Sequence, residues 1–326
     1  MTSSTQVNLS GYEAAIDQSA YYPQTTAGYV RIRGEDRQAF LQRQSTNDIQ
    51  LLKPKGSVTT VLTSATARIL DLLTLVHEAE AIGAITLPGR AQETARFLKS
   101  KIFFMDKISV DDASQEFAQF DVIGPEAPQM LQGIGLSHLP SRDEVVSGEV
   151  SGVKIRILRQ FDSRYRGLTP AQDWEAIGAI LKEAGAIELS PEAYAVLRVE
   201  MGVPETGHEL TEAYTPLETG LDWTVSGDKG CYTGQEIIAR QITYDKVTRQ
   251  MVGLSLSGEV EPAARVSTLE DNKNVGEITS YAHSPRFGHI ALAVVRKPHH
   301  DPGTELVVTG KGADILASVA ALPISD

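Results

Sequence analysis

The chain has one cysteine, Cys231, and it lies in the segment KGCYTGQE, residues 229–236 of a 326-residue sequence. Thr233 and Glu236 have the spacing of a capping box, which predicts that a helix begins just after the cysteine. Backbone N–H groups at a helix start carry partial positive charge, and Lys229 adds a full charge nearby, so both favour a thiolate over a thiol. We therefore interpret Cys231 and Lys229 as candidate catalytic residues.

Two glycines flank the cysteine and complete the motif together with Tyr232 and Gln235. Gly230 and Gly234 leave room for the close approach of a ligand or of another chain segment. An alternative fits the same residues equally well, because free cysteines are usually buried and unreactive. The motif thus predicts either a reactive Cys231 thiol or a small side chain packed in a tight turn.

The sequence contains no other arrangement of reactive residues with a recognised spacing. The seven histidines have no HExxH or CxxC context, so no metal site is predicted. There is no GxSxG motif and no GK pair followed by Ser or Thr, which excludes those hydrolase and phosphate-loop signatures. One cysteine cannot hold an iron–sulfur cluster alone, so a partner or a second chain would have to supply further thiolates.

The charge balance limits the partners of the protein. Forty-two acidic and 30 basic residues give a formal charge of −12, which argues against broad binding to nucleic acid or to anionic membranes. The N-terminus lacks the basic start, apolar core and cleavage site of a signal peptide, and no run of 18 apolar residues occurs. We expect a cytoplasmic monomer that makes no contact with membranes and does not bind nucleic acid directly.

Strands and helices are mixed in the part of the chain that must position the motif. Alternating apolar and polar residues predict six strands, and helical candidates lie between them. Because the two kinds of element do not form regular βαβ units, the pattern indicates an α+β fold. The predicted strands are 29–34, 57–64, 68–78, 81–87, 117–124 and 153–160, and the predicted helices are 35–44, 90–101 and 125–132.

Three more helices are predicted from their start signals. Thr169 as the N-cap and Pro170 in the first turn predict a helix that ends at Gly185. A second helix is predicted over residues 190–202, and TPLE, residues 215–218, has the capping-box spacing of a third, short one.

After Asp245 the pattern changes to short strands broken by glycine and proline. Such a pattern is typical of a small antiparallel β-barrel. We therefore predict two domains: an α+β region of two intertwined subdomains, residues 1–244, and a C-terminal barrel, residues 245–326.

The segment KGCYTGQE resembles the signature of the YgfZ-type folate-binding proteins, a branch of the glycine cleavage T-protein (aminomethyltransferase) superfamily. Upstream, LRVEMG (197–202), GHEL (207–210) and TPLE (215–218) resemble landmarks of that superfamily in the same order. AFLQRQSTNDIQLL, which follows Arg33 and Gly34, resembles its N-terminal strand and helix, and VGEITSYAHSPRFGHIALAVVR resembles its barrel. The similarity spans nearly the whole chain.

The resemblance implies a ring-like T-protein/YgfZ fold, in which two α+β regions and a C-terminal β-barrel surround a central pocket. The implied ligand of this pocket is tetrahydrofolate or a one-carbon derivative of it. The resemblance also implies a role in maintaining iron–sulfur enzymes and, in bacteria, in tRNA thiomethylation. Its implied partners are a reduced folate and iron–sulfur proteins or their assembly factors.

The resemblance also indicates candidate folate-binding residues. Glu200 is the glutamate of the Leu-Arg-x-Glu landmark, which in the superfamily binds the pterin; a carboxylate there can accept two parallel hydrogen bonds from the 2-amino group and a ring N–H. Its alternative is a helix-face glutamate paired with a cation. Arg198 lies on a different helical face, so the two need not serve one ligand. Asn47 is either a further ligand or part of the turn that ends the first helix.

Asp71 is the remaining candidate folate-binding residue, and its register is offset. In the T-protein enzymes the second aspartate of a Gly-Gly-x-x-Asp-Asp-Leu strand handles the proton of the folate amine. The matching stretch here, ARILDLL, puts Asp71 at the first acidic position and Leu72 at the second. Because strand side chains alternate between faces, Asp71 then points to the wrong side unless a bulge or a one-residue slip corrects it. The alternative is a solvated carboxylate on the polar face of the strand.

Together these residues favour a tetrahydrofolate-binding protein that supports the assembly or repair of iron–sulfur enzymes through a reactive Cys231, without glycine cleavage activity. The alternative is a folate-dependent aminomethyltransferase or other one-carbon transferase. A third interpretation is an interaction scaffold with an empty pocket, which predicts no affinity for folate.

Overall fold

The computed structural model describes residues 8–160, 164–310 and 314–325. These residues form two compact units, which are described separately. The first lies within Met1–Thr60 and Asp71–Tyr194, and the second within Val61–Leu70 and Ala195–Asp326. In the described parts of the chain, no helix is long and apolar enough to cross a membrane.

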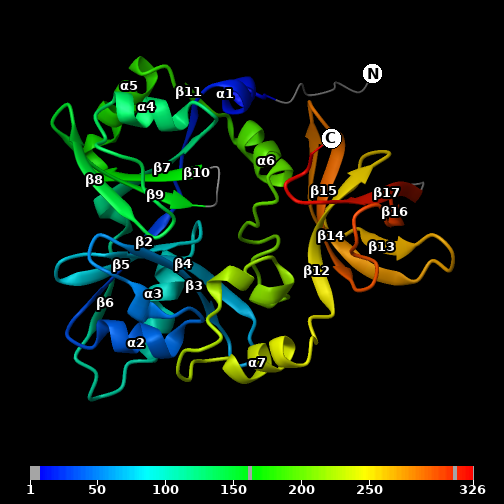
Figure 1. The fold of residues 1–326 in the computed structure, drawn as a ribbon, viewed down its shortest axis with the longest axis horizontal. Helices are drawn as coiled ribbons and strands as arrows, with labels where there is room; N and C mark the ends of the chain where they lie inside the picture. Colours follow the sequence, from blue (N-terminus) through cyan, green and yellow to red (C-terminus); the bar gives the residue numbers. More distant parts are fainter. Residues whose placement is uncertain (1–7, 161–163, 311–313, 326) are drawn as a thin grey trace. The chain divides into compact units, whose positions relative to one another are not determined.

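The first unit contains a six-stranded mixed sheet in the order β11-β1-β7-β10-β9-β8 (Figure 1). β1 pairs with β11 in parallel and with β7 in antiparallel orientation, and the β7·β10, β10·β9 and β9·β8 pairs are antiparallel. Its strands are β1 (Ala20–Pro23), β7 (Phe117–Ile123), β8 (Val145–Val150), β9 (Val153–Gln160), β10 (Arg164–Pro170) and β11 (Ile187–Glu188).

Two helices, α4 (Ala127–Gly133) and α5 (Trp174–Glu183), cover one face of this sheet. Val153, Ile155 and Ile157 of β9 are buried in the same apolar cluster as these helices. Every second residue of β9 therefore faces the helices, and the residues between them face the opposite side of the sheet.

The first unit also contains a five-stranded sheet in the order β3-β4-β5-β2-β6. Residues 61–70, which comprise the end of β3, the turn and the start of β4, group with the second unit. The strands are β2 (Gly28–Arg33), β3 (Ser57–Thr63), β4 (Ile69–His77), β5 (Ala81–Thr86) and β6 (Ser109–Asp112), and the helices that contact this sheet are α2 (Arg37–Gln44) and α3 (Ala91–Ser100). Helix α1 (Tyr12–Asp17) contacts β1 of the six-stranded sheet. Short 3-10 helices are η1 (Ile49–Leu51), η2 (Ser114–Glu116) and η3 (Ala171–Asp173).

The two sheets of the first unit share a buried apolar cluster. Leu158 of β9 and Leu168 of β10 lie in it together with Tyr29 of β2, Val76 of β4 and Ile85 of β5. Since Leu158 directly follows Ile157, β9 uses both of its faces for packing, one against the helices and one against the second sheet.

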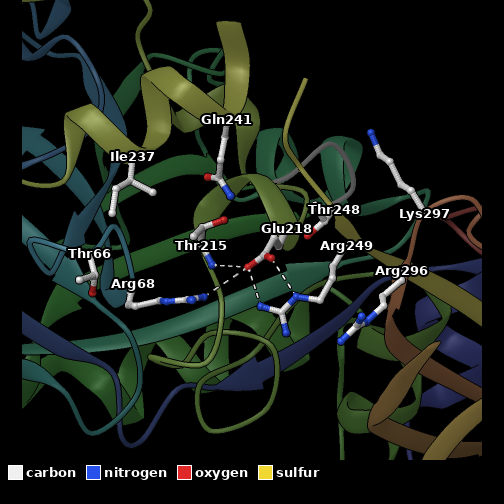
Figure 2. A pocket seen from close by; sticks show the side chains of 10 residues that line it. All are labelled: Thr66, Arg68, Thr215, Glu218, Ile237, Gln241, Thr248, Arg249, Arg296 and Lys297. Atoms are coloured by element: carbon white, nitrogen blue, oxygen red, sulfur yellow. Dashed lines mark hydrogen bonds and ion pairs between the residues drawn. The ribbon is translucent and has the colours of Figure 1, made fainter. Parts of the chain in front are cut away.

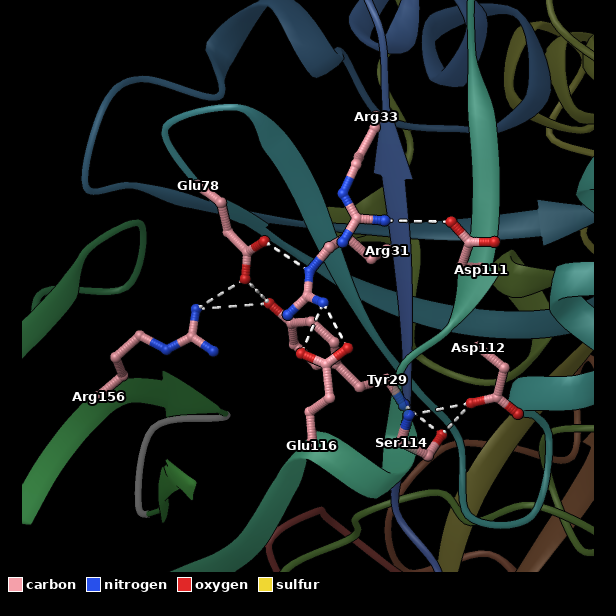
Figure 3. Close-up of polar contacts among 9 residues, drawn as sticks. All are labelled: Tyr29, Arg31, Arg33, Glu78, Asp111, Asp112, Ser114, Glu116 and Arg156. Atoms are coloured by element: carbon pink, nitrogen blue, oxygen red, sulfur yellow. Dashed lines mark hydrogen bonds and ion pairs between the residues drawn. The ribbon is translucent and has the colours of Figure 1, made fainter. Parts of the chain in front are cut away.

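A polar network joins the same two sheets (Figure 3). Glu78, in the turn after β4, accepts hydrogen bonds from Tyr29 at 2.7 Å, Arg31 at 3.0 Å and Arg156 at 3.2 Å, and Glu116 pairs with Arg31 at 2.7 Å. Burial alone would raise the pKa of Glu78, but the hydrogen bond from Tyr29 and the two guanidinium groups lower it below its usual value. The carboxylate therefore stays charged and holds β9 against the five-stranded sheet.

The C-terminal part of the second unit is a closed antiparallel barrel in the order β12-β15-β14-β13-β16-β17. Alternate residues point into its core, among them Val252 and Leu254 of β12 and Ala293 and Val295 of β15. The strands are β12 (Arg249–Leu256), β13 (Arg265–Thr268), β14 (Asn274–Ser284), β15 (Gly288–Arg296), β16 (Glu305–Thr309) and β17 (Asp314–Ala320).

Helical segments precede the barrel. They are α6 (Pro191–Glu200), η4 (Pro216–Glu218), η5 (Asp222–Thr224) and α7 (Gln235–Thr243). The carboxylate of Glu218 accepts the backbone N–H of Thr215 at 2.9 Å, as the predicted capping box requires.

The predicted α+β class with a C-terminal antiparallel barrel is confirmed. One helix start is wrong: Thr169 and Pro170 belong to β10, and α5 begins at Trp174. The Thr169 hydroxyl donates to the carbonyl of Lys154 on the neighbouring strand at 3.0 Å instead of capping a helix. The barrel begins at Arg249, close to the predicted domain boundary at residue 245. Residues 195–244, which were predicted to belong to the first domain, instead form one compact unit with the barrel.

Candidate functional site

The loop of Cys231 leads into helix α7, as predicted, and the Cys231 side chain is exposed. The predicted capping box is wrong, because the N-cap is Gly234 and no side chain caps the helix. Thr233 lies one position too early, and its carbonyl instead accepts a hydrogen bond from the Thr63 hydroxyl at 2.7 Å. The thiol is therefore accessible. The last residue of β3 is hydrogen-bonded to Thr233, two residues after the cysteine.

Gly234 has two reasons to be glycine. Its φ is +85°, in the left-handed region that favours glycine, and an added Cβ would lie 2.8 Å from the carbonyl oxygen of Ser64 and 3.1 Å from Cα of Ala67. Tyr232 is buried in one apolar cluster with Ala67 and Ile238, and burial raises its pKa to about 12. These two motif residues thus dock the β3–β4 turn on α7.

The motif lysine is buried and lies near an aromatic ring. The Lys229 ammonium is 5.1 Å from the centre of the Tyr232 ring, within the range of a cation–π contact. Glu236 pairs with Arg240 one turn further along α7 at 2.7 Å, but both side chains are mostly exposed, so this pair adds little stability. Activation of Cys231 by Lys229 remains a prediction, as do the proposed roles of Gly230 and Gln235.

Glu200, the last residue of α6, is buried, with 4% of its surface exposed. Its Oε1 accepts a hydrogen bond from the Ser284 hydroxyl at 2.6 Å. The same hydroxyl oxygen accepts the backbone N–H groups of Arg286 and Phe287, each at 3.0 Å. Because both lone pairs of Ser284 Oγ are used, its proton must point to Glu200, which fixes the orientation of the carboxylate.

Arg198 is buried and bound within the second unit. Its guanidinium lies 2.6 Å from the carboxylate of Glu205 and 3.3 Å from that of Glu209, and it donates to the Ser280 hydroxyl at 2.7 Å. Ser280 in turn donates to Glu209 at 2.6 Å. This network holds α6 against β14 of the barrel. The structure therefore supplies Arg198 with partners other than a folate.

Asp71 is not a solvated carboxylate, since only 1% of its surface is exposed. The expectation of solvation is wrong because the face of β4 that carries Asp71 is covered: Asp71 accepts the backbone N–H of Leu87 at 3.0 Å and the hydroxyl of Thr94 on α3. Burial raises the pKa of Asp71 to about 7, against the opposing effect of these hydrogen bonds and of Arg90. The following residue, Leu72, is less buried and points to the opposite face of the strand.

Asn47 is used for structure at the end of α2. Its backbone N–H donates to the Thr60 hydroxyl and its side-chain amide to the carbonyl of Thr59, both at 2.8 Å. Its side-chain oxygen accepts the backbone N–H of Asp48 at 2.9 Å. Asn47 and Asp71 thus belong to the first unit, whereas Glu200 and the Cys231 motif belong to the second.

Two features were missed in the sequence. The first is a buried cluster in the first unit, where Asp121 pairs with Arg166 at 2.5 Å and Arg164 at 3.2 Å and accepts the Tyr194 hydroxyl at 2.7 Å. Burial alone would raise the pKa of Asp121, but the two guanidinium groups lower it. Arg164 and Arg166 lie two residues apart in β10, so their side chains are on the same face of the strand. This spacing is the sequence signal for a strand face with buried charges.

The second feature is a cavity of about 760 Å³ in the second unit, which we call the basic cavity (Figure 2). Its walls come from the β3–β4 turn, η4, α7 and the ends of β12 and β15. No sequence spacing links these segments. The lining residues are Thr66, Arg68, Thr215, Glu218, Ile237, Gln241, Thr248, Arg249, Arg296 and Lys297. Among the described residues, no group of His, Cys, Asp or Glu could hold a metal ion.

Comparisons with known proteins agree with this architecture. The family model described as the GCVT N-terminal domain matches residues 6–229, and the one described as the glycine cleavage T-protein C-terminal barrel domain matches residues 249–326. The chain is 30% identical over 302 residues to a protein of Arabidopsis thaliana named as a chloroplastic transferase, At1g60990, which covers 91% of this chain and 69% of that protein. It is also 30% identical over 305 residues to an aminomethyltransferase of Thermus thermophilus, covering 91% of this chain and 84% of that one.

A solved structure shows the same fold. The glycine cleavage system aminomethyltransferase T of Bartonella henselae superposes with a TM-score of 0.84 at 21% identity, over 97% of this chain and 88% of that one. The predicted T-protein fold is thereby confirmed.

Proposed function

The chain belongs to the glycine cleavage T-protein family, and from this premise we propose that it binds tetrahydrofolate or a one-carbon derivative of it. The observation that supports the proposal is the burial and fixed orientation of Glu200. A pterin presents a 2-amino group and a ring N–H side by side, and a carboxylate is the side chain that matches two parallel donors.

The test is calorimetry with tetrahydrofolate on the parent protein and on Glu200→Gln. The variant loses the charge and turns one acceptor into a donor, so affinity should fall by about 1.5–3 kcal/mol, roughly 10- to 100-fold. Glu192→Gln is the matched control, because Glu192 is exposed in the first turn of the same helix. Equal affinity of Glu200→Gln and Glu192→Gln would show that Glu200 does not bind the pterin.

For the step that follows binding, the names of the relatives support one-carbon transfer. One-carbon transfer is the alternative function given above, and the similarity to the aminomethyltransferase of Thermus thermophilus favours it over a role with iron–sulfur enzymes. Aligned without a gap, the sequence nevertheless has Leu72 at the position where the T-protein enzymes have their aspartate, and Asp71 is hydrogen-bonded to α3. Loss of general acid–base help typically costs about 10²–10⁴ in rate. We therefore propose that any group transfer does not use the aminomethyl carrier of glycine cleavage.

That proposal is checked by incubating the protein with aminomethylated carrier protein and tetrahydrofolate and following methylene-tetrahydrofolate. The expected rate is at least 100-fold below that of an aminomethyltransferase assayed in parallel. Formation at the rate of the reference enzyme would contradict it.

The exposed thiol of Cys231 supports a second candidate, the maintenance of iron–sulfur enzymes by a folate-binding member of the YgfZ branch. An accessible thiolate can form a mixed disulfide or provide one ligand to a cluster in transfer, whereas a buried thiol cannot do so readily. In cells that lack the protein, Cys231→Ser should fail to restore iron–sulfur enzyme activities while it retains folate binding. Full restoration by Cys231→Ser would remove this candidate.

A further inference from the structure

The basic cavity carries an excess of positive charge (Figure 2). Four basic side chains line it, those of Arg68, Arg249, Arg296 and Lys297, against one acidic side chain, that of Glu218. This concentration is unusual in a chain with a formal charge of −12. Like charges that share a concave, partly desolvated surface repel each other more than charges in open water.

The single carboxylate of the cavity is already used for structure. Glu218 binds Arg249 with two contacts, at 2.9 and 3.1 Å, and lies 3.6 Å from Arg68. It also accepts the backbone N–H of Thr215 at 2.9 Å. Glu218 is buried, so it fixes the positions of two guanidinium groups but does not neutralise the rest of the cavity.

The two remaining cations have little or no counter-charge. Within the described residues, the Arg296 guanidinium forms no ion pair, and Figure 2 shows it extended without a contact to the other labelled side chains. Lys297 lies 3.7 Å from Asp245, whose side chain is 91% exposed. An exposed pair at this distance contributes little.

The strand register aggravates the repulsion. Arg249 of β12 and Arg296 of β15 are direct cross-strand partners. Like charges in such positions destabilise a sheet unless an opposite charge lies between them. On the helical wall, Oε1 of Gln241 is buried and, among the described residues, has no hydrogen-bond partner. This oxygen is an acceptor, so the amide would donate to an anion only when it is turned to place its NH2 group in this position.

We propose that the basic cavity binds a compact anion with two or more oxyanion groups, either a phosphate compound or a polycarboxylate. Guanidinium groups bind both kinds through paired N–H···O contacts, and Lys297 can add a point charge. A cavity of about 760 Å³ admits a small organic molecule. None of the lining residues is a predicted folate ligand, so the proposal stands independently of the proposed function.

The test is calorimetry on the full-length protein with inorganic pyrophosphate and, separately, with citrate, at low salt. We expect micromolar binding of at least one probe, which Arg296→Gln weakens about 10-fold or more. Arg296→Lys, which keeps the charge but loses the planar fork, should weaken it less. Arg286→Gln is the matched control, because Arg286 is an exposed arginine in the turn before β15 and does not line the cavity.

The two probes identify the source of the oxyanions, since selective binding of pyrophosphate assigns the cavity to phosphate compounds and selective binding of citrate to polycarboxylates. Two results would overturn the proposal. One is that neither probe binds below about 1 mM. The other is that Arg286→Gln weakens binding as much as Arg296→Gln, which would mean that the probes sense only the net charge of the chain.

Discussion

Asp71→Asn is expected to stabilise the protein more at pH 8 than at pH 5. In the folded protein the pKa of Asp71 is raised to about 7, mainly by burial, whereas the ordinary value is 3.8. The folded state therefore keeps a proton that the unfolded state releases, and stability falls as pH rises from about 4 to about 7. Below pH 4 both states are protonated, and no penalty applies.

The size of the effect follows from the shift. About two pKa units lie between pH 5 and pH 7, and each unit corresponds to 1.36 kcal/mol, so the free energy of unfolding loses about 2–3 kcal/mol over this interval through Asp71. Asparagine retains the local contacts, because its oxygen can accept the N–H of Leu87 and its amide can donate to the hydroxyl of Thr94. The variant should lack this part of the pH dependence.

Urea unfolding at pH 5 and pH 8 measures the difference. In a Trp223→Phe background, Trp174 is the remaining tryptophan, and it lies on α5 in the first unit, as Asp71 does. Asp17→Asn is the control, since Asp17 is exposed in the same unit, and it should change stability by no more than about 0.5 kcal/mol at either pH. If Asp71→Asn shifts stability equally at both pH values, the carboxyl is not buried as described. Its effect on folate affinity tests separately whether Asp71 contacts the ligand.

Two further predictions concern the Cys231 motif. Gly234→Ala should destabilise the second unit by about 1–3 kcal/mol, because the new methyl group would meet the carbonyl of Ser64 at a residue with φ of +85°, and a urea midpoint equal to that of the parent would contradict the described packing. The exposed Cys231 thiol should be alkylated in the native protein nearly as fast as in urea, and protection of about 100-fold or more would show that it is buried.

The way in which each strand is buried decides whether it can be predicted from the sequence. β9 was predicted because Val153, Ile155 and Ile157 alternate with polar residues, although Arg156 proved to face the second sheet. β10 was not predicted, because its buried face carries arginines that pair with Asp121. In the sequence these arginines look like residues of an exposed segment. The solvated interpretation of Asp71 failed for a related reason, since alternation indicates solvent only where one face of a strand is open.

The candidate site could also be predicted only in part. A local motif located the start of α7 to within one residue, because the residues of the motif are neighbours in the sequence. The basic cavity could not be predicted, since Arg68, Arg249 and Arg296 come from three distant segments that only the folded second unit brings together. Thr233 matched a capping box that the left-handed Gly234 displaced by one residue.

The docking of the β3–β4 turn on α7 has a consequence for how the chain folds. The hydrogen bond between Thr63 and Thr233 joins residues 170 positions apart. Closing a loop of that length alone costs about 4–5 kcal/mol of chain entropy, which makes this a late, non-local contact. A fragment that begins at residue 195 would contain Gly234 and Tyr232 but not the turn residue Ala67 that packs on them. The second unit is thus a unit of packing without being a continuous stretch of chain, and its autonomous folding would require the segment 61–70 to be supplied.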